Sequence, residues 1–160
     1  MAGLRPTPDR VRETVFNWLG QTLYGKRCLD LFSGSGALGF EAASRGAESV
    51  DLVENNRTAF QALQANQKKL ACANMALHCT DGLEFARHAR GRYHVIFLDP
   101  PFASDLMPKV LPLLIDRLEE GGVVYVESGD TFEPDAAWQV VKSARAGKVR
   151  YQLLQLNMDC

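Results

Sequence analysis

The sequence predicts an α/β protein built on a doubly wound, mostly parallel sheet of seven strands with a C-terminal antiparallel hairpin. Short apolar runs alternate with segments of helical periodicity through residues 27–127, which is the pattern of successive βαβ units. Two further strand-like runs are separated only by Gly147 and Lys148, as in a β-hairpin. The chain has 160 residues and is 46% hydrophobic, which suffices for one domain with a substantial core.

A first helix is expected at residues 9–19, ahead of the alternating region. Val11, Val15 and Trp18 recur there at helical spacing and form one apolar face. Pro8 stands just before it, where helix starts tolerate proline.

The remaining elements follow from local patterns of apolar residues. Strands are expected at residues 27–32, 49–54, 76–80, 93–98 and 122–127, helices at 37–45, 56–70, 83–89 and 106–118, and the hairpin strands at 138–146 and 149–156. No internal repeat or interdomain linker interrupts this order. Residues 1–160 are therefore expected to form a single domain.

Composition excludes several classes of protein. The net charge of −1 is not that of a strongly basic nucleic-acid binder. No apolar run approaches the ~20 residues of a membrane helix, and the N-terminus lacks the apolar core of a signal peptide. The four cysteines form no CxxC pair, and Cys28 and Cys79 are expected in strands as small apolar residues. We therefore expect reduced thiols, a cytoplasmic location and no membrane partner. The three histidines lack metal-ligand spacing, so no metal site is expected.

An unusual turn follows the apolar run at residues 93–98. It consists of Asp99, Pro100, Pro101 and Phe102. Proline lacks a backbone donor and fixes an extended chain, so this turn holds a carboxylate, bare carbonyls and a flat ring close together. Such a group suits a planar amine, and a nucleobase is the obvious candidate. Phe102 taken alone also fits a core aromatic residue.

A glycine-rich segment ends the first strand and opens the following helix. Gly34, Gly36 and Gly39 match G-x-G-x-x-G, and Glu54 ends the second strand, 20 residues after Gly34. Such glycines let the backbone approach a ligand, and the acid accepts hydrogen bonds from a ribose. The pattern fits NAD, whose pyrophosphate would lie on a helix N-terminus, and equally S-adenosylmethionine, which has no phosphate. The agreement of strand, glycines and acid argues against a turn without a ligand.

Two further acids favour S-adenosylmethionine. Asp30 lies just before the glycine segment, where a carboxylate suits a cationic amino-acid group and would repel a pyrophosphate. Asp81 follows the third strand, where it can accept a hydrogen bond from an adenine amine. Asp81 also suits the N-cap of the next helix, and the two roles are compatible.

Taken in order, these residues resemble the motifs of class I S-adenosylmethionine-dependent methyltransferases that act on amino groups of nucleobases. Residues 4–19, beginning Leu-Arg-Pro-Thr-Pro-Asp-Arg, and residues 31–42 narrow the resemblance to the bacterial 16S ribosomal RNA guanine-N2 methyltransferases. The resemblance spans nearly the whole chain. The glycine segment is its least specific part and the N-terminal stretch its most specific.

The resemblance implies a Rossmann-like fold and S-adenosylmethionine as cofactor, with S-adenosylhomocysteine as product. Catalytic roles are implied for Asp99, Pro100, Pro101 and Phe102. Cofactor-binding roles are implied for Asp30, Phe32, Ser33, Gly34, Gly36, Glu54, Asn55, Asp81, Gly82 and Thr7. RNA-binding roles are implied for Arg5, Arg10 and Arg12. Residues 1–20 would form the N-terminal helix and a lid over substrate and cofactor. Helix initiation for Thr7 and a solvated surface charge for the arginines are the plainer interpretations.

The implied partner is 16S ribosomal RNA, in a partly assembled small ribosomal subunit, bound by a monomer. The family usually carries a short basic, glycine-rich β segment before the Arg-Pro-Thr stretch, and here only Met1-Ala2-Gly3 precedes it. We expect this difference to weaken RNA binding, because a basic arm supplies phosphate contacts.

Three alternatives remain open on the sequence. An adenine-N6 methyltransferase on DNA or RNA fits the Asp99 turn equally well. An NAD-dependent oxidoreductase explains the glycines and Glu54 but gives that turn no role. A non-catalytic RNA-binding or scaffold protein on the same fold would need neither the glycine segment nor the Asp99 turn.

Overall fold

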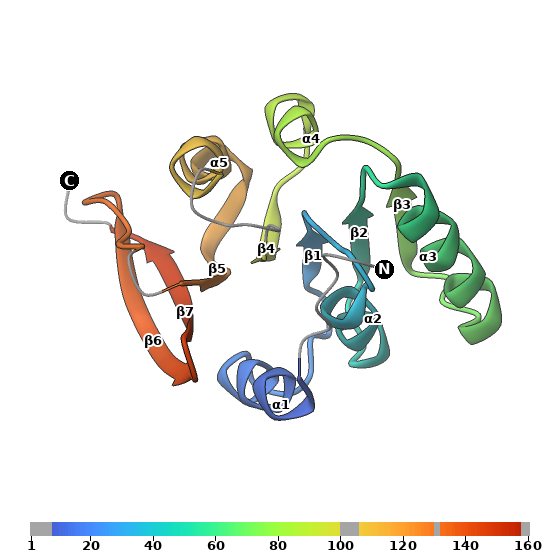
Figure 1. Ribbon diagram of the computed structural model, residues 1–160, viewed down its shortest axis with the longest axis horizontal. Coiled ribbons are helices and arrows are strands. Elements are labelled where there is room, and N and C mark those ends of the chain that lie inside the picture. Colours follow the sequence, from blue (N-terminus) through green and yellow to red (C-terminus); the bar gives the residue numbers. More distant parts are fainter. Residues whose placement is uncertain (1–7, 100–105, 130–131, 158–160) are drawn as a thin grey trace.

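The computed structural model describes residues 8–99, 106–129 and 132–157. Its sheet has seven strands in the order β3-β2-β1-β4-β5-β7-β6 (Figure 1). The strands are β1 Arg27–Asp30, β2 Ser49–Val53, β3 Met75–His78, β4 Tyr93–Leu98, β5 Leu118–Ser128, β6 Trp138–Ala146 and β7 Val149–Leu156. The first five pair in parallel, whereas β7 pairs antiparallel with both β5 and β6. The predicted fold class, including the C-terminal hairpin, is confirmed.

Helices cover both faces of the sheet. They are α1 Asp9–Trp18, α2 Ala37–Ser44, α3 Arg57–Leu70, α4 Gly82–His88 and α5 Met107–Leu114, with a short 3-10 helix η1 Ile115–Arg117. One buried cluster joins α1, α2 and α3 to the sheet, and a second joins α4 and α5 to its other face. Figure 1 shows α1 and α2 on one side of the central strands and α4 and α5 on the other.

The central strands are apolar because helices cover them on both faces. Residues Val95 to Leu98 of β4 are all buried, and their side chains alternate between the two clusters. Phe97 packs toward Phe16 of α1, with ring centroids 5.8 Å apart. Since α1 contributes the buried Val11, Val15 and Phe16, the predicted N-terminal helix is confirmed as part of the core.

Several predicted boundaries are wrong: for example, the first strand ends at Asp30 rather than at residue 32, and the fifth begins at Leu118 rather than at residue 122. The helix expected at residues 106–118 ends at Leu114, because η1 follows and the buried Leu118 already pairs with Tyr93 in the sheet. The register between β4 and β5 then shifts, and Gly121, with φ +75°, supplies the left-handed residue of this irregular start. β3 ends at His78, so Cys79 is exposed rather than within a strand.

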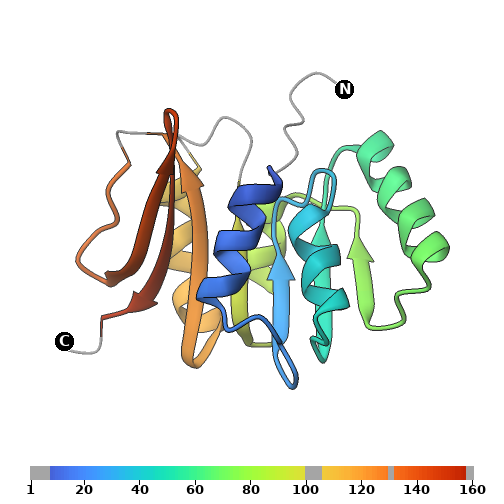
Figure 2. The same ribbon diagram turned by 90° about the horizontal axis from the view of Figure 1, so that it is seen from below.

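The connections place a topological switch point beside β1. From β1 the chain moves outward through β2 to β3, then crosses to β4 on the other side of β1. The loops after β1 and β4 therefore diverge, which in open α/β sheets opens a ligand crevice at the carboxyl ends of the strands. Figure 2 shows that α1 begins at this same edge of the sheet. Within the described residues, no helix combines the length and apolarity needed to cross a membrane.

Candidate active site

The glycine segment leaves β1 through a tight turn that is fixed by its own backbone. The Ser33 hydroxyl donates to the Asp30 carbonyl at 2.8 Å, and the Ser33 amide donates to the Val53 carbonyl at 2.9 Å. Gly34 and Gly36 have φ of +54° and +80°, the left-handed region that glycine adopts without strain. The turn therefore stays close to the end of β2 while it delivers the chain to the start of α2.

A side chain at Gly36 would also displace its neighbours. A Cβ atom there would lie 2.6 Å from Leu63 and 2.8 Å from the Phe40 ring. We predict that Gly36→Ala lowers the free energy of unfolding by about 2–4 kcal/mol, combining left-handed strain with overpacking. Thermal or urea unfolding measures the change.

Two alanine variants separate the causes of this loss. Gly147→Ala carries a positive φ without any contact within 4 Å, and Gly91→Ala meets nothing within 4 Å at an ordinary φ. Gly147→Ala is expected to lose only the strain part, about 1–2 kcal/mol, and Gly91→Ala should change little. Equal losses in Gly36→Ala and Gly147→Ala would show that packing around Gly36 contributes nothing.

Asp30 is buried beneath this turn, with 3% of its surface exposed. Its Oδ2 accepts a hydrogen bond from the Gly39 amide at 3.0 Å, which ties the first turn of α2 to β1. Burial raises the pKa of this carboxyl to about 7; the Gly39 amide opposes the rise and the charge of Glu54 adds to it. The side chain can therefore change its charge when a cation or a proton reaches it at neutral pH.

Glu54 lies at the rim of the crevice and already organises it. Its two carboxylate oxygens accept from the Gly34 amide at 2.8 Å and from the Asn56 amide at 2.9 Å. A carboxylate oxygen can accept two hydrogen bonds, so each oxygen of Glu54 could also accept a hydrogen bond from a ligand diol. The neighbouring Asn55 is exposed. The predicted link between the glycine segment and Glu54 is thus a direct contact.

Asp81 begins α4, as the sequence indicates. Its Oδ2 accepts from the Glu84 amide at 3.2 Å, and the residue is exposed. The following Gly82 is buried against Phe32, since a Cβ atom there would lie 2.6 Å from that ring. Phe32 and Asp81 are thereby brought to the same rim of the crevice, across β1 from Asp99.

Asp99 follows β4 directly and is half-buried. The last registered pairs of β4 and β5 are Phe97 with Tyr125 and Leu98 with Val126, which places Asp99 beside Glu127. The Tyr125 hydroxyl donates to Oε2 of Glu127 at 2.9 Å. Burial raises the pKa of Tyr125, with further increases from the charges of Glu127 and Asp99.

Tyr125 and Glu127 are absent from the site that sequence patterns predict. The sequence does place Tyr125 and Glu127 two residues apart in a strand, so their side chains lie on the same face of the sheet. A local motif could not supply it, because the order of strands decides which residues become neighbours.

The other predicted site residues fall into two groups. Thr7, Arg5, Pro100, Pro101 and Phe102 lie outside the described residues. Arg10 and Arg12 lie on α1, where Arg10 is exposed. Arg12 contacts Asp9 at 2.8 Å and Glu41 of α2 at 3.4 Å, so its charge is largely balanced within the protein.

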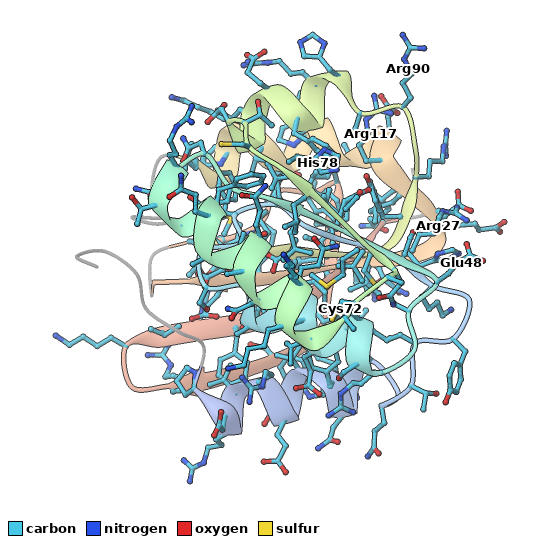
Figure 3. The ribbon with its side chains drawn as sticks, turned by 90° about the vertical axis from the view of Figure 1, so that its right-hand side faces the viewer. Arg27, Glu48, Cys72, His78, Arg90 and Arg117 are labelled. Atoms are coloured by element: carbon cyan, nitrogen blue, oxygen red, sulfur yellow. The ribbon has the colours of Figure 1, made fainter. Side chains whose placement is uncertain are left out.

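The predicted chemistry of cysteine and histidine can be compared with their surroundings. Cys28 is buried, which raises the pKa of its thiol to about 12, as for an inert core residue. His78, seen in Figure 3, contacts Asp51 at 3.0 Å and the Phe85 ring. In the described part of the chain, no three His, Cys, Asp or Glu side chains gather as a metal site would require.

Comparisons with known proteins agree with this arrangement. The family model of conserved hypothetical protein 95 matches residues 1–155. The chain is 40% identical to "Ribosomal RNA small subunit methyltransferase D" of Escherichia coli K12, over 96% of this chain and 80% of that protein. It is 38% identical to the protein of the same name from Haemophilus influenzae, over 96% of this chain and 83% of that one.

Solved structures give the same result for the fold. The structure described as a putative methyltransferase yhhF from Escherichia coli superposes with a TM-score of 0.88 at 35% identity, covering 98% of this chain and 91% of that one. The putative methylase HI0767 from Haemophilus influenzae has a TM-score of 0.82 at 35% identity, covering 94% of this chain and 99% of that one. The fold is the Rossmann-like fold of class I methyltransferases, and the chain belongs to the conserved hypothetical protein 95 family.

Proposed function

We propose that this protein transfers a methyl group from S-adenosylmethionine to the exocyclic N2 amine of a guanine in 16S ribosomal RNA. The observation that carries the proposal is the switch point, where the glycine segment, Glu54 and Asp99 meet at one edge of the sheet. The names of relatives 36–40% identical to the chain, which are small-subunit ribosomal RNA methyltransferases, support RNA as the substrate.

The residues of the crevice fit the proposed cofactor. Glu54 would accept from the ribose hydroxyls and Asp81 from the adenine amine, while the turn from Asp30 to Gly36 would enclose the amino-acid end. Asp30, which is buried and has a pKa of about 7, supports this fit. A pyrophosphate there would be repelled by the carboxylate, whereas an ammonium group would stabilise the negative charge of Asp30. When bound, S-adenosylmethionine supplies an electrophilic methyl group on a positively charged sulfur.

Asp99 supplies what the substrate amine needs. The N2 lone pair of guanine is delocalised into the ring, so the nitrogen must pyramidalise before it attacks. Accepting the amine hydrogens on the Asp99 carboxylate and the Pro100 carbonyl would orient the lone pair and stabilise the positive charge that develops on nitrogen. In the transfer, the guanine nitrogen would bond to the methyl carbon, the carbon–sulfur electron pair would stay on sulfur, and the methylated nitrogen would then release one proton to water. Phe102 would stack on the flipped-out base.

Calorimetric titration tests the cofactor and uses the pKa of Asp30. We predict that S-adenosylhomocysteine binds more tightly as the pH rises from about 5.5 to 7.5, by up to tenfold per pH unit, since Asp30 must ionise to pair with its amino group. Asp30→Asn should abolish this dependence. NAD should give no binding heat, and tight NAD binding without any response to S-adenosylhomocysteine would contradict the proposal.

The same pKa has a consequence for the unliganded protein. The unfolded chain ionises Asp30 near its ordinary pKa of 3.8, whereas the folded protein holds the proton up to about pH 7. The contribution of Asp30 to the free energy of unfolding is therefore largest below pH 3.8 and declines as the pH rises toward 7.

A basic hairpin supports RNA as the partner. Between residues 136 and 157 the chain carries Lys142, Arg145, Lys148 and Arg150 and no acidic residue. Because Ser128, the last residue of β5, pairs with Arg150, the hairpin turn lies at the carboxyl edge of the sheet, as Figure 2 shows. β6 lies three strands from β4, roughly 14 Å from Asp99 and within reach of a few nucleotides.

The placement of these charges favours an external anion. Arg145 is registered directly opposite Arg150, so two basic residues lie next to each other on the hairpin. Arg150 donates to the Phe132 carbonyl and contacts Glu133, while Lys142, Arg145 and Lys148 are exposed. Arg27, at the amino end of β1, lies near Glu48 (Figure 3) and also pairs with Glu119.

We predict that the double variant Lys142→Ala, Lys148→Ala raises KM for RNA without changing kcat or the affinity for S-adenosylhomocysteine. The dependence of log KM on log salt concentration should become shallower by between one and two, since two phosphate contacts are removed. Lys69→Ala, an exposed lysine on α3, is the matched control. An unchanged salt dependence would exclude the hairpin as a phosphate contact.

The remaining expectations belong to this proposal. A single catalytic domain that acts as a monomer on a partly assembled small subunit is consistent with the size of the chain, and a cytoplasmic location follows from that substrate. The proposed N-terminal lid and the RNA contacts of Arg5, Arg10 and Arg12 are part of the same hypothesis.

A further inference from the structure

We propose that Glu127 is the residue that selects guanine: it accepts the N1–H of the base while Asp99 accepts the N2 amine. This inference rests on the proposed function. It explains how the site distinguishes guanine from adenine, which the Asp99 turn alone does not do.

The first observation is the position of Glu127. Leu98 and Val126 are the last registered pair between β4 and β5; Asp99 is the residue after Leu98, and Glu127 is the residue after Val126. Neighbouring parallel strands lie about 4.8 Å apart, so two carboxylates stand side by side at the edge that receives the substrate. Both residues are half-buried, so part of each remains at the surface.

The second observation is the support beneath Glu127. The fully buried Tyr125 donates its hydroxyl to Oε2 of Glu127 at 2.9 Å. Burial raises the pKa of Tyr125, and the charges of Glu127 and Asp99 raise it further, so this hydroxyl remains a donor at any physiological pH. A carboxylate held by a buried donor keeps one orientation, and its two oxygens together offer about four acceptor positions.

The chemistry of the two purines then decides between them. Guanine presents N1–H and the N2 amine as adjacent donors, which two neighbouring carboxylates match. Adenine presents its N6 amine beside N1, which is an acceptor, so a carboxylate there would face a lone pair. Sites built to hydrogen-bond a donor reject analogues that lack it, because a buried polar group is left unpaired.

The test uses 2-aminopurine, which keeps the 2-amine of guanine but carries an acceptor at N1. After the target guanine has been mapped, labelled methyl transfer is measured on small-subunit RNA with guanine or 2-aminopurine at that position. The wild-type protein is expected to prefer guanine at least 10²-fold. In Glu127→Gln, transfer to guanine should fall about 10- to 100-fold. Transfer to 2-aminopurine should fall less or rise, because the amide can donate to N1.

Two variants control the result. Glu120→Gln changes an exposed glutamate at the start of β5 and should behave as wild type. Tyr125→Phe keeps the ring but removes the donor that orients Glu127, so it should reduce the preference for guanine by a smaller factor. Binding of S-adenosylhomocysteine should be unchanged in every variant, which excludes unfolding as the cause.

The outcomes separate the two proposals. If the wild-type protein methylates guanine and Glu127→Gln lowers the rates of transfer to guanine and to 2-aminopurine by the same factor, Glu127 has only a structural role and this inference is wrong. If wild type transfers no methyl group to guanine, the proposed function itself fails. An adenine-specific wild type would overturn both.

Discussion

Replacing Asp99 with alanine is expected to lower kcat for methyl transfer about 10²–10³-fold, while the affinity for S-adenosylhomocysteine stays within a few-fold of wild type. The magnitude is that of removing one preorganised group that stabilises transition-state charge. Asp99 directly follows β4, across the crevice from Glu54, which directly follows β2, so its loss should affect the substrate amine and not the cofactor. Single-turnover transfer of a labelled methyl group measures the rate directly.

Asp116→Ala is the matched control, because Asp116 is an exposed acid in η1. Asp99→Asn refines the result: it keeps an acceptor oxygen but loses the charge, so its rate should lie between those of alanine and wild type. Wild-type turnover in Asp99→Ala with normal cofactor binding would remove Asp99 from the mechanism.

The second large effect is expected at Glu54. Glu54→Ala should weaken S-adenosylhomocysteine binding about 10²-fold or more, because the variant loses charge-assisted hydrogen bonds to the ribose, each worth about 1.5–3 kcal/mol. It also frees the Gly34 and Asn56 amides, which Glu54 holds at 2.8 and 2.9 Å, so the glycine turn loses its anchor. At saturating cofactor the rate of transfer should recover most of its wild-type value.

Glu54→Gln separates these two contributions. The amide oxygen can still accept from Gly34, so the turn should persist while the charged contact is lost, and the loss of affinity should be smaller. Glu48→Ala, an exposed acid before β2, serves as the control. Equal cofactor affinity in wild type and Glu54→Ala would show that the ribose lies elsewhere.

The fold could be predicted from the sequence because its core strands are buried on both faces. Runs such as Tyr93–Leu98 and the helical spacing of Val11 and Val15 are direct consequences of that burial. The boundaries that failed depend on tertiary pairing. Leu118 joins the sheet because Tyr93 is available as a partner, which no local pattern around residues 106–118 indicates.

In the candidate site, too, contacts within one βαβ unit could be predicted from the sequence, whereas contacts set by the order of the strands could not. The contact between Gly34 and Glu54 was predictable, since a fixed spacing across one βαβ unit brings these residues together. Tyr125 and Glu127 were not, because they reach Asp99 only through the crossover that sets β4 between β1 and β5. The pairing of Arg12 with Glu41 depends likewise on how α1 packs against α2.

Mapping the methylated base tests guanine-N2 methylation of 16S ribosomal RNA most directly. The protein, labelled S-adenosylmethionine and either unmodified 30S subunits or free 16S ribosomal RNA are incubated, and the product nucleosides are identified by mass spectrometry. We predict N2-methylguanine at a single position in the small-subunit RNA. N6-methyladenine, or no transfer by a protein that binds S-adenosylhomocysteine normally, would contradict it.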